Sequence, residues 1–164
     1  MLKTLAMLPF LVLVGGVFAE ESLPPVVLYS PTVCLACVDY ADHLRNNGFK
    51  VTVHPTADMA AVKRRLNVPK HLEAEPSAVV GGYFIEGHVP ADDIKELLRE
   101  KRKARGLAVP GLPLGAPGRE YSNPTCDTAC TVLDGDTGPG RVRRELYNTL
   151  LVKPDGDTST YARH

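Results

Sequence analysis

The stretch Val26-Val27-Leu28-Tyr29-Ser30-Pro31-Thr32-Val33-Cys34-Leu35-Ala36-Cys37 decides the fold of this chain. Its apolar beginning predicts a short buried strand. Apolar positions then recur at helical spacing and predict a helix over residues 33–46, which Gly48 ends. The stretch is therefore a strand that leads into a helix with two cysteines on its first turn.

Cys34 and Cys37 lie three residues apart, so both sulfurs are on one face of the predicted helix. Free backbone N–H groups and the positive end of the helix dipole favour thiolates there, and such settings lower a thiol pKa from about 8.5 to roughly 3.5–7.5. A dithiol of low pKa can exchange disulfides or bind a soft metal. A purely structural disulfide is the third interpretation of this pair.

The pattern continues with alternating strands and helices. It predicts a strand over residues 49–54, a helix over 58–66 with Asp58 as its N-cap, a hairpin of 77–80 and 83–86 around Gly81-Gly82, and a helix over 89–105. This order of elements is typical of a single thioredoxin-like α/β domain, in which two parallel strands and their crossover helix carry the cysteine pair.

The later part of the chain has a different composition. Residues 106–118 hold three prolines and four glycines among small apolar residues, which predicts an ordered wrapping loop. Residues 120–141 form a polar insert that contains Cys126 and Cys130. A C-terminal β-hairpin is predicted from residues 146–152 and 158–161, which flank the turn sequence Pro154-Asp155-Gly156-Asp157.

Residues 1–19 are predicted to be a secretory signal peptide. Lys3 precedes an apolar run from Leu5 to Val17, and Val17 and Ala19 are small residues before a cut. Residues 20–164 would then be exported, periplasmic in a bacterial-type cell, and without a stable membrane anchor. With 18 basic and 19 acidic residues they carry a formal charge of −1, so nucleic acid is excluded as an expected partner.

Four cysteines in an exported chain are normally oxidised unless a metal or a reductant holds them. The exported part has no methionine tract that could bind a soft metal through thioethers, so thiolates and imidazoles are the candidate ligands. Cys126 and Cys130 have i, i+4 spacing, which on a helical turn puts their sulfurs on one face. The two dithiols could therefore converge on a soft-metal site of four thiolates, Cys34, Cys37, Cys126 and Cys130.

The competing interpretation is a thiol–disulfide oxidoreductase with Cys34 and Cys37 as the catalytic dithiol. Pro76 stands just before the third predicted strand, where oxidoreductases of the thioredoxin type place a cis proline against their cysteine pair. Proline is also common at the first residue of a strand, so its position alone does not decide the function. His88, after Gly87 at a hairpin end, is a weak candidate metal ligand.

Beyond these motifs, the chain resembles the CopG-type periplasmic copper-resistance proteins, a domain of unknown function with a thioredoxin-like fold. The similarity covers most of residues 20–164. It is carried by several strings: Tyr29-Ser30-Pro31-Thr32, His43-Leu44, Asn47-Gly48-Phe49-Lys50-Val51, Tyr83-Phe84-Ile85-Glu86-Gly87-His88-Val89-Pro90-Ala91, Gly106-Leu107-Ala108-Val109-Pro110-Gly111, and the ending from Leu150-Leu151-Val152 to Tyr161-Ala162.

The resemblance implies copper handling outside the cytoplasm, with copper ions and periplasmic copper or thiol-redox proteins as partners. The chain also departs from the commoner family pattern. Many relatives have Cys-Gly-Cys-Cys where this chain has Ala36 in the third place, and Cys-His-Thr where it has Glu75-Pro76-Ser77. Many also have methionine where it has Leu112 and Arg119. The resemblance therefore implies that the soft metal is Cu(I), with the thiolates of Cys34, Cys37, Cys126 and Cys130 as its expected ligands, and an oxidoreductase acting on copper or on disulfides remains open.

Overall fold

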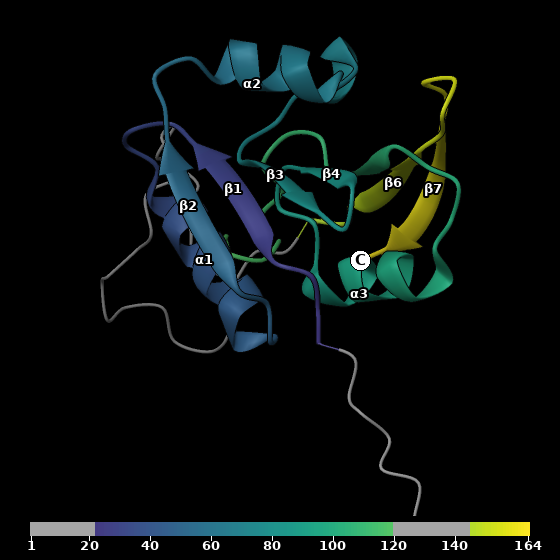
Figure 1. Ribbon diagram of the computed structural model, residues 1–164, viewed down its shortest axis with the longest axis horizontal. Helices are drawn as coiled ribbons and strands as arrows, with labels where there is room; N and C mark the ends of the chain where they lie inside the picture. Colours follow the sequence, from purple (N-terminus) through teal and green to yellow (C-terminus); the bar gives the residue numbers. More distant parts are fainter. Residues whose placement is uncertain (1–21, 120–144) are drawn as a thin grey trace, which may run out of the picture.

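A computed structural model describes residues 22–119 and 145–164 of the protein. The predicted signal peptide, Cys126 and Cys130 lie outside the described residues. The described residues form one seven-stranded sheet with the strand order β2-β1-β3-β4-β5-β6-β7 and three α-helices (Figure 1). This confirms the mixed α/β class, while the assignment to the thioredoxin-like fold stays a prediction.

The first unit is strand β1 (Val26–Ser30), helix α1 (Leu35–Asn46) and strand β2 (Val51–Pro55). β1 and β2 are parallel, with Val26 opposite Val51. One face of α1 is buried, and its members share helical spacing: Ala36, Cys37, Tyr40, Ala41 and Leu44. The helix ends before Gly48, whose φ of +91° a residue with a side chain rarely adopts.

The next unit brings a hairpin to the centre of the sheet. Helix α2 (Met59–Leu66) begins after Asp58, whose side chain accepts a hydrogen bond from the amide of Ala61 at 2.8 Å. A short 3-10 helix, η1 (Lys70–Leu72), leads to strands β3 (Ser77–Val80) and β4 (Tyr83–Glu86). Gly81 and Gly82 both have positive φ, as a tight turn between twisted strands requires. The hairpin and the Asp58 cap are both confirmed.

The third helix is shorter than the sequence predicts. Helix α3 (Ala91–Glu100) ends because Lys101 adopts a left-handed conformation with φ of +50°. Strand β5 (Gly106–Ala108) then pairs in parallel with β4. A Cβ at Gly106 would lie 1.9 Å from the carbonyl oxygen of Phe84, so only glycine allows this pairing. The segment 106–118 therefore begins as a strand and continues as turns.

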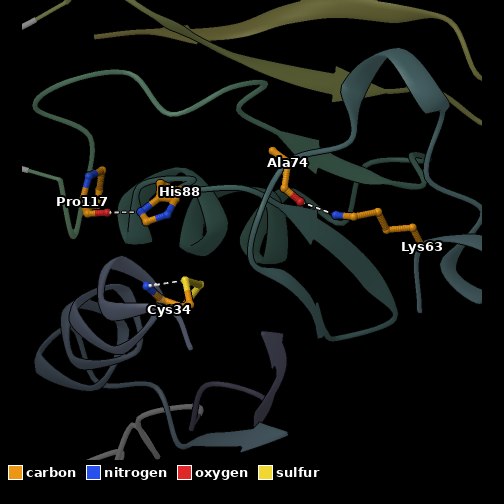
Figure 2. Close-up of a disulfide and its surroundings, with 6 residues drawn as sticks. Cys34, Lys63, Ala74, His88 and Pro117 are labelled. Atoms are coloured by element: carbon orange, nitrogen blue, oxygen red, sulfur yellow. Dashed lines mark hydrogen bonds between the residues drawn. A yellow bond between two sulfur atoms is a disulfide. The ribbon is translucent and has the colours of Figure 1, made fainter. Parts of the chain in front are cut away.

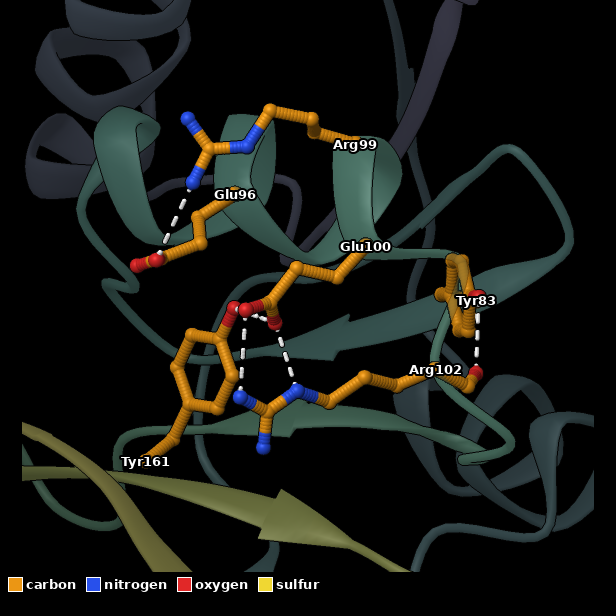
Figure 3. Close-up of polar contacts among 6 residues, drawn as sticks. All are labelled: Tyr83, Glu96, Arg99, Glu100, Arg102 and Tyr161. Carbon is orange, nitrogen blue, oxygen red and sulfur yellow. Dashed lines mark hydrogen bonds and ion pairs between the residues drawn. The ribbon is translucent and has the colours of Figure 1, made fainter.

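A C-terminal hairpin completes the sheet, as predicted. Strand β6 (Asn148–Val152) pairs with β5, and strand β7 (Thr158–Arg163) pairs with β6. Side chains join this hairpin to α3 and to the segment that follows it (Figure 3). Tyr161 donates a hydrogen bond from its hydroxyl to Glu100 at 3.2 Å, and the guanidinium of Arg102 lies 5.1 Å from the centre of the Tyr161 ring.

The sheet has a hydrophobic cluster on each face. The larger cluster joins β1, β4 and β5 to α1 and α3, and its central members are Leu28, Tyr40, Leu44, Ile85, Ile94, Leu97 and Leu107. The smaller cluster lies under α2 and η1 and contains Val68, Leu72, Phe84, Ala108 and Val152. Figure 1 shows α2 on the side of the sheet away from α1 and α3. Packing on both faces fixes the positions of the strand ends, where the candidate site lies.

Candidate functional site at the carboxyl ends of three strands

Three of the strands that run in the same direction, β1, β4 and β5, lead at the same edge of the sheet to the candidate site. β3 is antiparallel to both β1 and β4, so β1 and β4 are parallel to each other, and β5 is parallel to β4. The chain after β1 leads to Cys34, the chain after β4 leads to His88, and the chain after β5 leads to Arg119. Topology therefore brings these three segments together at one edge.

Cys34 and Cys37 form a disulfide at the beginning of α1, with their Cα atoms 5.3 Å apart. Cys34 is the N-cap of the helix, and its sulfur accepts a hydrogen bond from the amide of Cys37 at 3.2 Å. Cys37 is 2% exposed, whereas Cys34 is only partly buried. A thiol that attacks this disulfide from solvent therefore meets the Cys34 sulfur first.

The surface around Cys34 is apolar. Val33 is 87% exposed, Leu35 is 56% exposed and Val38 is 55% exposed. These three residues occupy the outward side of the stretch that carries the cysteines, while Ala36 and Cys37 face the core. The accessible sulfur is therefore flanked along the chain by exposed apolar side chains.

Pro76 lies at the same edge of the sheet. Ser77 is opposite Tyr29 in the register of β1 and β3, so Pro76 lies level with the end of β1. Its peptide bond with Glu75 is cis. The carbonyl oxygen of Pro76 accepts a hydrogen bond from the amide of Gly87 at 2.8 Å, which joins the Pro76 segment to the residue before His88.

His88 is completely buried. Its Nδ1 lies 2.6 Å from the carbonyl oxygen of Pro117, and since a carbonyl can only accept, Nδ1 carries the hydrogen. Nε2 then has a lone pair, and among the described residues it has no hydrogen-bond partner. The pKa of His88 is lowered to about 4, mainly by burial and also by the charge of Arg119, while the bond to Pro117 opposes the change. The ring is therefore neutral at pH 7.

The position of His88 is set by its neighbours on two sides. Its ring centre is 5.1 Å from that of Tyr40, which is one helical turn after Cys37. The Tyr40 hydroxyl donates a hydrogen bond to the carbonyl of Val89 at 2.8 Å, and burial raises the pKa of Tyr40. Figure 2 shows the imidazole between Pro117 and the disulfide. An imidazole held through Nδ1 by a backbone carbonyl, with Nε2 free, has the orientation of a typical metal-binding histidine.

Residues 113–119, which we call the strap, cover the inner side of the cysteine helix. Gly118 approaches it so closely that a Cβ there would lie 2.7 Å from the amide nitrogen of Tyr40 and 2.9 Å from the carbonyl oxygen of Ala36. Leu114 is tied to Glu145 through two hydrogen bonds, from its amide to the Glu145 carboxylate at 3.0 Å and from the Glu145 amide to its carbonyl at 2.9 Å. The strap thus joins α1 to the chain that enters β6.

A buried ion pair joins Lys63 of α2 to Glu86 at the end of β4, and Figure 2 shows the Lys63 ammonium pointing to the carbonyl of Ala74. The ammonium of Lys63 donates to the carboxylate of Glu86, to the carbonyl of Ala74 and, at 3.2 Å, to the Ser77 hydroxyl. The Ala74 amide donates to the same Glu86 oxygen at 2.8 Å. Burial raises the pKa of Glu86, and the hydrogen bond from Lys63 opposes that rise. The pair ties α2 and the Ala74 segment to the end of β4.

Sequence reasoning missed this pair. A signal was present for Lys63, which lies four residues after buried Met59 and therefore on the inner face of α2. No such signal identified Glu86 as its partner, because the two residues are far apart in the sequence. Arg119, which is 8% exposed, was also missed as a buried charge.

The other histidines named by their motifs are engaged elsewhere. The Nε2 of His43 accepts a hydrogen bond from the amide of Ala91 at 3.2 Å, and His54 stacks on Tyr29 with ring centres 5.6 Å apart. Within residues 22–119 and 145–164, no cluster of three or more histidine, cysteine or acidic side chains is arranged to bind a metal ion. A metal site with three or more such ligands would need side chains from outside those ranges.

In the described part of the chain, none of the helices has the length and apolar character needed to span a bilayer.

Comparison with known proteins adds two findings. Residues 76–119, from Pro76 to Arg119, match a family described as "Protein of unknown function, DUF411". Two solved structures, described as copper resistance protein CopG in form 1 and form 2, are each 37% identical to the chain with a TM-score of 0.70. Each match covers 87% of this chain and 98% of the solved chain. Among curated proteins, none matches the sequence.

Proposed function

The chain belongs to the family of the copper resistance protein CopG, and on that premise we propose that it handles copper in copper resistance. In this proposal it binds Cu(I) through the thiolates of Cys34 and Cys37 together with those of Cys126 and Cys130. The observation that carries the proposal is the cysteine pair at the start of α1, with one sulfur accessible and the other buried. Thiolates are the ligands that Cu(I) prefers.

Copper binding requires the dithiol form of the pair. Two thiols of a reductant would reduce the Cys34–Cys37 disulfide. They would supply two electrons and two protons, and the two thiols of the reductant would themselves become a disulfide. Because Cys34 is the more accessible sulfur, it would form the mixed disulfide, and Cys37 would leave as a thiolate. Cu(I) then displaces the protons of the two thiols.

The second pair of cysteines lies outside the described residues, and the ends of the chain that surround it support its place in the site. Arg119 follows Gly118, which touches the backbone of α1 around Cys37. Glu145 is hydrogen-bonded to Leu114 of the strap. One end of the intervening chain therefore starts beside α1, and the other end is joined to the strap. Cys126 is seven positions after Arg119, so an extended chain of about 3.3 Å per residue easily covers the distance back to α1.

His88 is the further ligand that we propose. The Nε2 atom of His88 suits copper as a ligand. It is buried and has no hydrogen-bond partner among the described residues, and the Nδ1–H on the other side of the ring is held by the carbonyl of Pro117. A neutral imidazole is an acceptable ligand for copper. The chain would thus offer four thiolates and one oriented imidazole.

The test is metal analysis and thiol titration of protein purified without oxygen from copper-fed cells. The double variant Cys34→Ser, Cys37→Ser should lose tight Cu(I) binding, measured by competition with a chromogenic Cu(I) chelator, because a hydroxyl is a poor ligand for a soft ion. Cys126→Ser, Cys130→Ser is the matched variant and should weaken the site without abolishing it. Wild-type copper content and affinity in the first double variant would refute the proposal.

A second candidate function is thiol–disulfide exchange, because the observed pair is a disulfide with one accessible and one buried sulfur beside an apolar surface. For this function Cys37→Ser should trap mixed disulfides through Cys34. Pro76, at the same edge of the sheet, would border the site. Absence of trapped partners in periplasmic extracts, together with no reduction of insulin by the wild type, would exclude this function.

We propose that the protein acts in the periplasm after removal of residues 1–19. Its partners would be copper ions and other exported copper or thiol-redox proteins. N-terminal sequencing of protein from a periplasmic fraction should give a chain that begins at Glu20. A chain that begins at Met1 in the cytoplasmic fraction would contradict this localisation.

A further inference from the structure

Arg119 ends the strap as a buried cation. Its side chain and backbone together are 8% exposed, and its buried Nε atom has no hydrogen-bond partner in the part of the chain that the structure describes. Its backbone is held in place, because its amide donates to the carbonyl of Ala116 at 2.7 Å and its carbonyl accepts from the amide of Gly115 at 3.2 Å. The position of this residue is therefore set by the turns of the strap.

The positive charge of Arg119 has no close counter-ion in the described ranges. None of the ion pairs found among residues 22–119 and 145–164 includes it. Burial lowers the pKa of Arg119, and the carboxylate of Glu145 opposes that change. That carboxylate already accepts the amide of Leu114 at 3.0 Å. Glu145 therefore offsets the charge of Arg119 only from beyond salt-bridge distance, and a further anion close to this buried guanidinium would be stabilised by it.

The backbone next to this charge lies against the helix of the cysteine pair. Gly118, the residue before Arg119, touches the backbone of α1 at Ala36 and Tyr40, the two positions that flank the turn of Cys37. Pro117, one residue earlier, holds His88, and Arg119 is the strongest charge acting on that imidazole. Figure 2 shows Pro117 and His88 on the side of α1 that carries the disulfide.

We propose that Arg119 is the counter-charge of the reduced cysteine pair. In the disulfide both sulfurs are neutral. Two electrons and two protons from a thiol reductant convert the disulfide into two thiols. Loss of the two protons gives two thiolates with two negative charges. One bound Cu(I) neutralises only one of these charges. Arg119 stabilises this anionic state and therefore favours reduction of the pair. The inference rests on the proposed function only in that Cys34 and Cys37 cycle between disulfide and dithiol.

The experiment uses the full chain without copper, equilibrated in glutathione buffers of known ratio. Differential alkylation followed by mass spectrometry of the peptide with Cys34 and Cys37 reports the reduced fraction of this pair alone. Arg119→Met should make the disulfide about tenfold harder to reduce, a shift of about 30 mV to lower potential, because the favourable charge is lost. Arg119→Lys keeps the charge and should stay within about threefold of the wild type.

Arg99→Met is the matched control, because it removes one positive charge from an exposed position on α3 that is paired with Glu96. It should leave the glutathione equilibrium unchanged. If Arg119→Met does not fold, as judged by circular dichroism, Arg119→Gln gives the same comparison with a polar side chain. A folded Arg119→Met or Arg119→Gln variant with the wild-type equilibrium would overturn the inference.

Copper measurements separate this inference from the proposed function. Cu(I) affinity of the wild type and of Arg119→Met is measured in parallel with the glutathione equilibrium. Absence of Cu(I) binding in the wild type would remove the copper proposal and leave the glutathione result to stand by itself. Tight Cu(I) binding in the wild type, combined with no effect of Arg119→Met on the glutathione equilibrium, would refute the counter-charge role of Arg119 and leave the copper proposal in place.

Discussion

Replacing Lys63 by methionine should destabilise the fold strongly. The Lys63 and Glu86 side chains are 7% and 0% exposed, and the ammonium donates to three acceptors, which are the Glu86 carboxylate, the Ala74 carbonyl and the Ser77 hydroxyl. Methionine keeps most of the apolar stem but removes the charge. The carboxylate would keep only two neutral donors, the Ala74 amide at 2.8 Å and the Ser77 hydroxyl, and its second oxygen has no partner among the described residues.

The size of the effect follows from that loss. Breaking a buried ion pair by removing one partner typically costs about 3–5 kcal/mol, because the remaining charge stays buried without compensation. Lys63→Met should fall in this range at pH 8. The double variant Lys63→Met, Glu86→Gln should recover about 2 kcal/mol, because it removes the uncompensated charge while the glutamine oxygen still accepts the Ala74 amide.

The effect should depend on pH in a defined direction. Burial already raises the pKa of Glu86 above its ordinary value, and Lys63 opposes that rise. Without Lys63 the pKa in the folded state rises further above that of the unfolded chain, so the folded variant takes up a proton first as the pH falls. The loss in free energy of unfolding of Lys63→Met relative to the wild type is therefore largest above the folded-state pKa of Glu86, and it shrinks as the pH falls through that pKa.

Urea denaturation at pH 8, 7, 6 and 5, with the disulfide kept oxidised, measures this deficit directly. We expect the largest difference between wild type and Lys63→Met at pH 8 and the smallest at pH 5. Lys63→Met, Glu86→Gln should show a deficit that is nearly independent of pH. A loss below about 1 kcal/mol at pH 8, or a deficit that does not change with pH, would refute the reasoning.

Three further predictions concern stability and are measured by the same urea assay. Gly118→Ala should cost about 1–3 kcal/mol, because the new Cβ meets backbone atoms of Ala36 and Tyr40 and the residue has a φ of +79°; wild-type stability would mean that the strap does not touch α1. Tyr40→Phe should cost about 1–2 kcal/mol, since it leaves the buried carbonyl of Val89 without its donor at 2.8 Å; a neutral effect would indicate another donor. Asp58→Ala should cost about 1 kcal/mol through loss of the α2 N-cap, with Asp58→Asn as the control that keeps it.

Local sequence signals predicted the elements whose boundaries depend on nearby residues. The hairpin of β3 and β4 agrees with the prediction residue by residue, because Gly81 and Gly82 alone permit its turn. The helix after Asp58 begins where the cap residue indicates. The C-terminal hairpin follows the turn sequence at residues 154–157 in the same way.

Elements that depend on distant partners were predicted less well. α3 ends at Glu100, although helix-forming residues continue to Arg105, because the chain must turn at Lys101 to bring Gly106 beside Phe84. β5 is three residues long and has no alternation that could identify it as a strand. Its existence is determined by the strands on either side.

By itself, the sequence determined that a cysteine pair stands at the start of a helix that follows a buried strand, since the spacing of the cysteines and of the apolar residues is a local property. Only the tertiary structure decided the surroundings of that pair. His88, Lys63, Glu86 and Arg119 read as ordinary polar residues in the sequence, yet all are buried near one edge of the sheet. The physical reason is that burial of a polar side chain depends on which strands and helices cover it, and the elements that do so here come from distant parts of the chain.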